Sequence, residues 1–530
     1  MKQALILLLT CLSTSAATIN VTTLPEFKAA VLTNAVESDL VQILGAGFTI
    51  PNGIIIDRHI SFTIAGQATN MTTLTSGNPP ETFCIWIKST SANPFTVHDL
   101  RCNGSTFDTS GFFLTGGNAG TTPTAGPIHF YNIYMPQVYT RGISPGSGDS
   151  FGLIDHCYFE AAQAGQFNPV AFFGNAYLSW ANSNPYGTTN ACYVEDCYFK
   201  TRVGWTGNGF FDAYNGAQFV IRHSVFDGNA NNGNHGYDSQ ITSSRTAEIY
   251  DNVFTNIHSG NLLLDWRGGG LLWYSNKVSA PGTAISAITP ELKLYRACDG
   301  SVNTIPNYVN VPQVITFTGN PSNGQQESTF FTTYTFVSSL GAVAGQVLIG
   351  ATEALSISNF VQAIVHDPSG AGVHYSAATL SDPDVLVKSF DATSLTVTNR
   401  LDAVNGWPSA FQQGVIGMLP RTNNSAVRYP IYSWNNTING TNFGFALSFQ
   451  GDSCNGQTNY VDFLLQSGRD FFQDTDIHWV APPVGYTPLV YPHPLSSYTP
   501  PTPPVTNGPS PIIITGNVTL KGGIQLKVAP

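Results

Sequence analysis

A short pattern of residues recurs along the middle of the chain and constrains its fold more than any other feature. Each copy has a large apolar residue, a small or polar residue three positions later, and a second apolar residue two positions after that. The middle residues lie 24 to 40 residues apart, a spacing typical of repeat proteins, whose units are too small to bury a core alone. The five copies are Ile154/Cys157/Phe159, Val194/Cys197/Phe199, Ile221/Ser224/Phe226, Ile249/Asn252/Phe254 and Trp273/Asn276/Val278.

Between these copies the chain has the character of strands and turns. Short apolar stretches alternate with Gly, Asn and Asp, and almost no helical periodicity is present. The pattern predicts an all-β fold in which parallel strands stack rung upon rung, a parallel β-solenoid. Residues that face outward in such a fold align from one rung to the next, so we expect any functional site to follow an outward column.

Changes in composition predict five segments. Lys2 and the apolar stretch after it, ended by small residues, indicate an export signal that is too short to span a membrane. Ile357, Phe360, Val361 and Ile364 have the spacing of one helical face inside a region that otherwise contains short strands. The predicted segments are the export signal (1–17), an N-terminal cap with the first part of the solenoid (18–304), a small inserted α+β module (305–402), the C-terminal part of the solenoid (403–497) and a Pro/Thr-rich tail with terminal strands (498–530).

Charge and composition exclude several partners. The net charge is −11, and the 21 Lys and Arg residues form no cluster, so a nucleic-acid ligand is not expected. The same negative charge disfavours a polyanionic glycan unless a bound cation bridges it. No later stretch is apolar enough to predict a membrane span. With the export signal, these features predict a secreted or cell-surface protein.

The cysteines allow two interpretations. Removal of the export signal would leave seven, an odd number, so at least one would stay unpaired within the chain. Cys157 and Cys197 occupy equivalent positions in the repeat. An internal stack of small residues is the favoured interpretation of this pair, and a disulfide is the alternative.

Several stretches resemble the right-handed parallel β-helix proteins of the pectate-lyase-like superfamily, in particular secreted bacterial members. The resemblance covers about residues 40–300 and 403–497. It implies a right-handed parallel β-helix and a carbohydrate-active protein or an adhesive one, since the superfamily includes polysaccharide lyases, glycoside hydrolases, epimerases, adhesins and phage tailspikes. The matching residues are Ile249-Tyr250-Asp251-Asn252-Val253-Phe254, Arg267-Gly268-Gly269 and the closing Gly485-Tyr486-Thr487-Pro488 with Tyr491-Pro492-His493-Pro494-Leu495.

The predicted insertion has a resemblance of its own. It is similar to a small module found in phage tail and virion structural proteins, which implies a role in attachment or assembly. The matching residues are Tyr334-Thr335-Phe336, Val347-Leu348-Ile349-Gly350-Ala351-Thr352, the helical stretch after them, Pro383-Asp384-Val385 and Leu395-Thr396-Val397-Thr398.

Three aspartates precede the middle residues of successive repeats by similar distances. Asp212, Asp238 and Asp265 are therefore expected at comparable points of consecutive rungs, with carboxylates about 5 Å apart. With calcium, such a row would bind an acidic sugar, and Arg245 or Arg267 would act as base or charge clamp. Without metal, two carboxylates can act as acid and base in glycoside hydrolysis. Turn capping by these aspartates remains the structural alternative.

Other polar and aromatic residues lie near this row in the sequence. His235 and Tyr237 directly precede Asp238 in the densest polar cluster of the chain, which also includes Arg245. Aromatic rings can stack on sugars, and we expect Trp205, Tyr214, Tyr237 and Trp266 to serve as such platforms, with ordinary core packing as the alternative for each.

The favoured hypothesis is an exported enzyme that acts on an extracellular polysaccharide, as a lyase or a glycoside hydrolase. The alternative is a non-catalytic surface, adhesin or filament protein that associates with itself through its C-terminal strands, which lie at Ile512–Thr515 and Val518–Val528.

Overall fold

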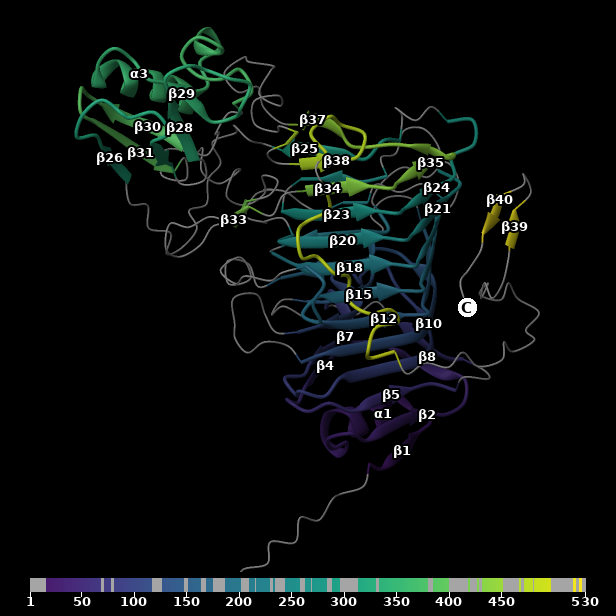
Figure 1. Ribbon diagram of the computed structural model, residues 1–530. Coiled ribbons are helices and arrows are strands. Elements are labelled where there is room, and N and C mark those ends of the chain that lie inside the picture. Colours follow the sequence, from purple (N-terminus) through teal and green to yellow (C-terminus); the bar gives the residue numbers. More distant parts are fainter. Residues whose placement is uncertain are drawn as a thin grey trace, which may run out of the picture.

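The structure is a computed structural model (Figure 1). Strands dominate it, and parallel pairing prevails in its two largest sheets. The described residues are 16–67, 71–77, 81–116, 126–146, 151–163, 168–174, 186–201, 209–214, 216–228, 232–233, 244–257, 263–267, 269–283, 288–295, 313–329, 333–379, 385–399, 418–419, 427–428, 431–450, 467–468, 471–479, 481–496, 518–520 and 524–526.

The first and largest sheet contains 21 strands, most of them paired in parallel with a strand of the next repeat. Figure 1 shows many of them stacked one above another. They are β1 (Thr18–Val21), β2 (Leu40–Ile43), β3 (Gly47–Ile50), β5 (Thr63–Ala65), β6 (Thr72–Ser76), β8 (Phe95–Asn103), β10 (Ile128–Val138), β12 (Gly152–Asp155), β13 (Tyr158–Ala161), β15 (Cys192–Glu195), β16 (Tyr198–Lys200), β18 (Gln218–Arg222), β19 (Val225–Asp227), β20 (Thr246–Tyr250), β21 (Val253–Thr255), β23 (Gly270–Tyr274), β24 (Lys277–Val278), β34 (Ile431–Trp434), β35 (Thr437–Ile438), β36 (Thr441–Asn442) and β38 (Phe471–Gln473).

Two further parallel sheets contribute to the same core. The second sheet has six strands, which are β4 (Ile54–Asp57), β7 (Phe83–Lys88), β9 (Gly111–Thr115), β11 (Arg141–Ser144), β14 (Asn168–Phe173) and β17 (Phe211–Tyr214). The third has β22 (Asp265–Trp266), β25 (Glu291–Tyr295) and β37 (Ala446–Gln450). One large cluster of buried apolar side chains extends from Val21 to Phe471 and joins residues of all three sheets.

The five copies of the repeat lie in register. The first apolar residue of each copy pairs with that of the next through β12, β15, β18, β20 and β23. The last apolar residue pairs in the same way through β13, β16, β19, β21 and β24. The predicted frame is therefore confirmed, and it continues in both directions, to Phe130/Ile133/Met135 in β10 and to Ser433/Asn436/Ile438 in β34 and β35.

Side chains of one kind stack inside the core. The rings of Phe159, Phe199, Phe226 and Phe254 follow one another at centroid distances of 5.1, 4.8 and 4.7 Å. The middle residues of the repeat form a second column, in which Cys157 and Cys197 are buried and free, as the favoured interpretation of that pair predicted.

The turn inside each rung has one conformation. The residue before the middle position has a left-handed backbone, with φ between 51° and 56°. Small polar residues and histidine tolerate this region better than β-branched ones, which accounts for the sequence at these points. The residues are Asn132, His156, Asp196, His223, Asp251, Ser275 and Asn435.

A short helix stands at the N-terminal end of the stack. α1 (Leu24–Ala29) continues as the π-helical turn η1 (Ala30–Asn34). A capping box begins it, since Thr23 Oγ1 accepts from the Glu26 N–H (3.4 Å) and Glu26 accepts from the Thr23 N–H (3.1 Å). Phe27 and Val31 are fully buried against the first strands, so the helix covers apolar surface there.

Residues between β25 and β34 contain a separate apolar core, drawn in green in Figure 1. α3 (Glu353–Val365) buries Ile357, Phe360 and Ile364, as the helical spacing predicted. Two small sheets pack with this helix. One sheet contains β26 (Gln313–Thr316), β31 (Ser394–Asn399) and β30 (Val385–Phe390), and the other contains β27 (Gln326–Ser328), β28 (Thr333–Val337) and β29 (Gln346–Leu348). The 3-10 turn η4 (Pro368–Gly370) follows α3. After this unit the chain returns to the first sheet, where β34 pairs directly with β23.

Two short antiparallel pairs complete the described strands. They are β32 (Met418–Leu419) with β33 (Val427–Arg428), and β39 (Val518–Leu520) with β40 (Ile524–Leu526). Over the described part of the chain, neither helix has the length and apolar character needed to cross a membrane.

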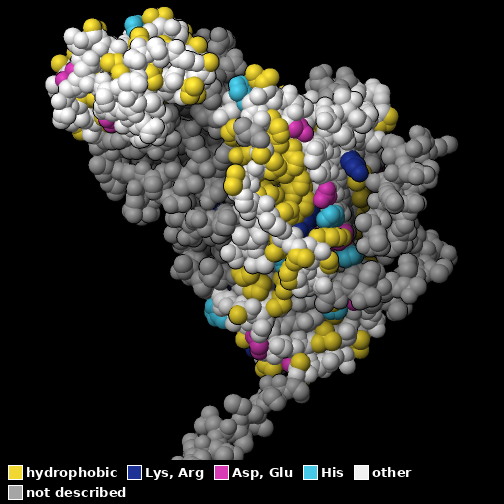
Figure 2. Space-filling view, in the orientation of Figure 1, with side chains coloured by type: hydrophobic (Ala, Val, Ile, Leu, Met, Phe, Trp, Pro, Cys, Tyr) yellow, Lys and Arg dark blue, Asp and Glu magenta, His cyan; other side chains and the backbone are white. Residues whose placement is uncertain are grey.

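Residues 481–496, called the strap from here on, run back along the outer face of the first sheet without forming a strand. Figure 1 shows the strap as a yellow trace in front of β20, β18, β15 and β12, and Figure 2 shows hydrophobic side chains gathered along this face. Its carbonyl groups at Leu489 and Val490 accept hydrogen bonds from Arg222, at 2.5 and 2.9 Å. The His493 N–H donates to Glu195 Oε2 at 3.0 Å.

The strap covers a row of charged and aromatic side chains at the ends of successive strands. Parallel pairing aligns them, and most are buried although they point away from the core. The row consists of Asp155, Glu195, Arg222, Tyr250, Tyr274 and Trp434. Arg222 is fully buried, pairs with Glu195 at 2.5 Å and donates to the Tyr250 hydroxyl at 2.7 Å.

Candidate functional site

An acidic column follows the outer face of the second and third sheets. Phe211 and Ala213 belong to the core, so the residue between them, Asp212, faces outward. On the next rung Gly233 donates its N–H to the Phe211 carbonyl at 3.3 Å and forms a parallel bridge with Asp265. Asp265 in turn pairs in register with Glu291. The column therefore runs Asp212, Gly233, Asp265, Glu291.

The structure thus brings two of the three predicted aspartates, Asp212 and Asp265, into one column with the end-to-end spacing of the predicted row, and a glycine occupies the point between them. Gly233, which has no side chain, occupies the rung between Asp212 and Asp265, so their backbones lie two strand spacings or about 10 Å apart. Glu291, which sequence reasoning missed, is the immediate neighbour of Asp265 at about 5 Å. Asp238 and three other predicted site residues, His235, Trp205 and Tyr237, lie outside the described residues.

Asp212 is a buried carboxylate with several donors. Its Oδ1 accepts the Ala213 N–H at 2.9 Å, and its Oδ2 accepts from the Tyr214 hydroxyl and, at 3.5 Å, from the Asn168 amide. Arg141 donates to the Tyr214 hydroxyl at 3.4 Å. Burial, together with the Asp212 carboxylate, raises the pKa of Tyr214, so this phenol remains a hydrogen-bond donor at neutral pH.

The ring of Tyr214 is buried next to the column. Its ring stacks on that of Phe173 at 4.8 Å and 9°, and the Arg141 guanidinium lies over both rings. Tyr214 therefore lies next to an aspartate of the column, Asp212, as predicted. Phe173 and Arg141 were missed, because the strand that precedes Tyr214 in space lies about 40 residues before it in the chain.

Asp265 is held by an arginine on its own strand. Arg267 donates to Asp265 Oδ2 from Nε at 3.1 Å and from Nη2 at 2.7 Å. Residues two apart on a strand face the same side, which explains why this pair forms. Arg267, predicted as a base or clamp, is thus placed as a charge partner of the column, and an arginine stays protonated at any pH that a protein tolerates.

Trp266 does not have the predicted stacking role. It is fully buried in the core, near Phe219, and its Nε1 donates to the Gly269 carbonyl at 3.1 Å. The reason is the alternation of side chains along a strand, since Asp265 faces outward and the next residue must therefore face inward.

Asp212 and Asp265 alone do not make a calcium site, and Asp238, the third predicted ligand, lies outside the described residues. Calcium binds six to eight oxygens at about 2.3–2.6 Å, and the carboxylates of Asp212 and Asp265, whose strands are about 10 Å apart, supply at most four. Asp265, the neighbour of Glu291, is already paired with Arg267. Among the described residues no group of three or more His, Cys, Asp or Glu side chains is placed to hold a metal. No chemical step is therefore derived through calcium.

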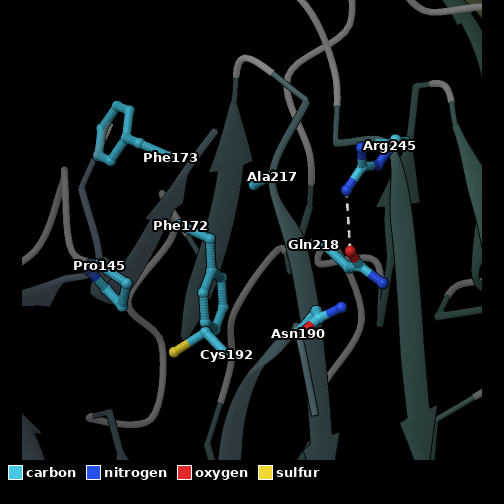
Figure 3. A pocket seen from close by; sticks show the side chains of 8 residues that line it. All are labelled: Pro145, Phe172, Phe173, Asn190, Cys192, Ala217, Gln218 and Arg245. Atoms are coloured by element: carbon cyan, nitrogen blue, oxygen red, sulfur yellow. Dashed lines mark hydrogen bonds between the residues drawn. The ribbon is translucent and has the colours of Figure 1, made fainter. Parts of the chain in front are cut away.

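Arg245 lies in a small pocket next to Phe173 (Figure 3). Figure 3 shows Arg245 and Gln218 pointing toward each other, with Arg245 Nη2 donating to Gln218 Oε1 at 2.8 Å. The side chain is almost completely buried. Cys192 also lines the pocket, but burial raises the pKa of its thiol, so it is not an activated nucleophile.

Comparison of the chain with protein-family models, with curated proteins and with solved structures gives no match.

Proposed function

We propose that the chain is a secreted, carbohydrate-active protein built as a right-handed parallel β-helix of the pectate-lyase-like kind, and that it hydrolyses an extracellular polysaccharide along the acidic column. The β-helix is supported by parallel strands that pair in register from one repeat to the next over a single core. The observation that carries the activity is the pair Asp212 and Asp265, aligned on one outer face with Gly233 between them.

The spacing of this pair favours hydrolysis with inversion over a calcium-assisted lyase reaction. Inverting glycosidases hold their two carboxyl groups about 6.5–9.5 Å apart, to leave room for a water beside the sugar, whereas retaining enzymes need about 5–5.5 Å. Strands two spacings apart hold the backbones of Asp212 and Asp265 about 10 Å apart, closer to the inverting separation than to the retaining one. One carboxyl group would protonate the leaving oxygen, and the other would accept a proton from the attacking water.

Neighbouring side chains have roles consistent with a sugar ligand. Phe173, which is half-buried and stacks on the buried Tyr214, offers an aromatic edge beside the column that suits the apolar faces of sugar rings. Gly233 contributes no side chain between the carboxylates. Arg267 and Arg141 partly offset the negative charge of the column.

Loss of activity in either aspartate variant tests this function. The purified protein is incubated with a broad panel of polysaccharides, with and without calcium, and reducing ends and the ultraviolet absorbance of unsaturated products are followed together. Wild type is expected to release reducing ends without unsaturated products. Asp212→Asn and Asp265→Asn should each lower the rate at least about 100-fold, because general acid and base catalysis contribute about 10²–10⁴-fold.

Asp57→Asn serves as the matched control. Asp57 lies on β4 of the same sheet, is exposed and pairs only with Lys88 at 3.4 Å among its described neighbours, so its variant should keep wild-type activity. Equal activity in all three variants would place catalysis elsewhere. Unsaturated products would identify a lyase and contradict the hydrolytic mechanism.

A non-catalytic role in adhesion or filament formation is the second candidate. It is supported by β39 and β40, which pair with each other and, within the described part of the chain, leave their outer edges open to a further strand. Under this hypothesis the full chain associates in solution and the chain ending at residue 497 does not. Light scattering that gives a monomer for both would contradict self-association through these strands.

A further inference from the structure

The part of the first sheet that the strap covers, called its seat from here on, contains several buried titratable side chains. From the sheet, Asp155, Glu195, Arg222 and Glu248 face the strap, and each is less than 4 % exposed. From the strap, Tyr486 donates to Glu248 at 2.6 Å and Ser496 donates to Asp155 at 3.2 Å. Most of the strap's polar anchors are therefore groups that change charge with pH.

His493 is the strap residue whose geometry requires an uncharged ring. It is 3 % exposed, its ring lies 4.7 Å from that of Tyr193, and its Nδ1 accepts the Leu495 N–H at 3.1 Å. An imidazole nitrogen that accepts a hydrogen bond carries no proton, so protonation at Nδ1 would break this bond and place a cation in a buried site.

The groups around His493 do not compensate such a charge. Arg222 and His129 face it from β18 and β10, and both disfavour a second cation. Among the described residues, Asp155 on β12 favours it, but that carboxylate already accepts from His129 at 2.9 Å and His156 at 3.0 Å. Burial, then Arg222 and His129, lower the pKa of His493 to about 4.

A second histidine lies under the strap. The ring of His223 contacts that of Tyr491 at 3.8 Å, and Tyr491 also donates to Asp196 at 2.8 Å. Burial, followed by the neighbouring Arg222, lowers the pKa of His223 to about 4. Both histidines are thus neutral while the strap is seated.

We propose that the strap is an acid-sensitive latch, which stays on the first sheet while His493 and His223 are neutral and leaves its seat in mild acid, when these histidines take up protons. This device lies on a different face from the acidic column, so it does not depend on the proposed hydrolysis.

The direction of the effect follows from the pKa values. When the strap leaves the sheet, each histidine is solvated and has a pKa near 6.5, whereas the pKa is about 4 while the strap is bound. Between pH 6.5 and about 4 the detached form therefore binds more protons than the bound form, and acid favours detachment. At pH 5 each histidine lowers the equilibrium constant for binding of the strap to the first sheet about 30-fold. Burial raises the pKa of Glu195, Asp196 and Glu248. These carboxyl groups therefore take up protons more readily while the strap is bound, and they favour the bound strap as the pH falls. The proposal requires that the two histidines outweigh them.

Amide hydrogen exchange of the full chain between pH 7.5 and 4.5 tests the latch, with rates corrected for the pH dependence of intrinsic exchange. The reporters are the His493 and Leu495 amides, which donate to Glu195 and to the His493 ring. Their protection is expected to fall at least 30-fold between pH 7 and pH 5, while β18 and β20 stay protected. Unchanged protection of the strap, or equal loss in β18 and β20, would overturn the proposal.

Three variants make the assignment specific. His493→Asn keeps an acceptor for the Leu495 N–H but cannot be protonated, so its strap should stay more protected than wild type at pH 5. His478→Asn is the matched control, because His478 is exposed and contacts Asp476 outside the seat, and it should behave as wild type. Gly187→Ala places a Cβ about 2.1 Å from the Thr487 carbonyl oxygen at φ 75°, and should release this part of the strap at every pH. A His493→Asn strap that opens like wild type contradicts the proposal.

Discussion

Replacement of Arg222 by methionine is expected to lower the free energy of unfolding by about 3–5 kcal/mol, because it leaves the buried Glu195 carboxylate without its partner. Arg222 is fully buried and donates to Glu195, Tyr250 and two carbonyl groups of the strap. The variant therefore also removes the main connection between the strap and the first sheet. Denaturation by guanidinium, followed by fluorescence, measures the change.

An exposed ion pair on the same sheet is the control for this prediction. Lys200 and Glu160 approach at 3.7 Å with the lysine side chain 41 % exposed, and Lys200→Met should cost about 0–1 kcal/mol. The double variant Arg222→Met with Glu195→Leu should recover part of the loss, since it removes both charges. A single Arg222→Met variant as stable as Lys200→Met would show that the buried pair does not hold the strap.

Replacement of Asn276 by alanine is expected to cost about 2–5 kcal/mol, because it interrupts a column of hydrogen-bonded amides in the core. Asn276 Oδ1 accepts from the Asn252 N–H at 3.2 Å and from its side-chain amide at 3.1 Å. Asn276 Nδ2 donates to the Ile249 carbonyl at 2.9 Å and to Asn436 Oδ1 at 3.1 Å. Each buried group left without a partner costs about 1–3 kcal/mol.

Asn442→Ala provides the comparison for Asn276→Ala. Asn442 is exposed in β36 of the same sheet, and changes at such positions usually stay within about 0.5 kcal/mol. Asn276→Ser should lie between the two, because serine already occupies this column at position 224 and keeps one acceptor. Thermal or guanidinium unfolding that does not separate Asn276→Ala from Asn442→Ala would contradict the role assigned to the column.

The strand register was the part of the fold most accessible from the sequence. The repeat fixed which residues face the core because its two apolar positions recur at constant spacing across a turn with one backbone conformation. Its N-terminal copy, in β10, was not predicted for a physical reason. At the N-terminal end the middle position is Ile133, an apolar residue, and only the rungs nearer the C-terminus use the hydrogen-bonding Asn276 and Asn436.

The acidic column was predicted only in part. Counting back from the middle residue of a rung assumes loops of equal length, and the loops differ, so Gly233 occupies the point expected for another residue. Trp266 could have been excluded from the sequence, since neighbours on a strand face opposite sides and Asp265 was already assigned outward. The network under the strap was not predictable, because Arg222 meets Leu489 only through the return of the chain along the sheet, 267 residues later.

The most direct test of the central proposal, that the acidic column binds and cleaves a polysaccharide, is a crystal structure of the Asp265→Asn variant soaked with a mixture of oligosaccharides. The account predicts sugar density along the column, with a ring beside Tyr214 and the scissile bond between positions 212 and 265. Sugar density confined to another face, or no bound sugar at saturating concentration, would contradict it.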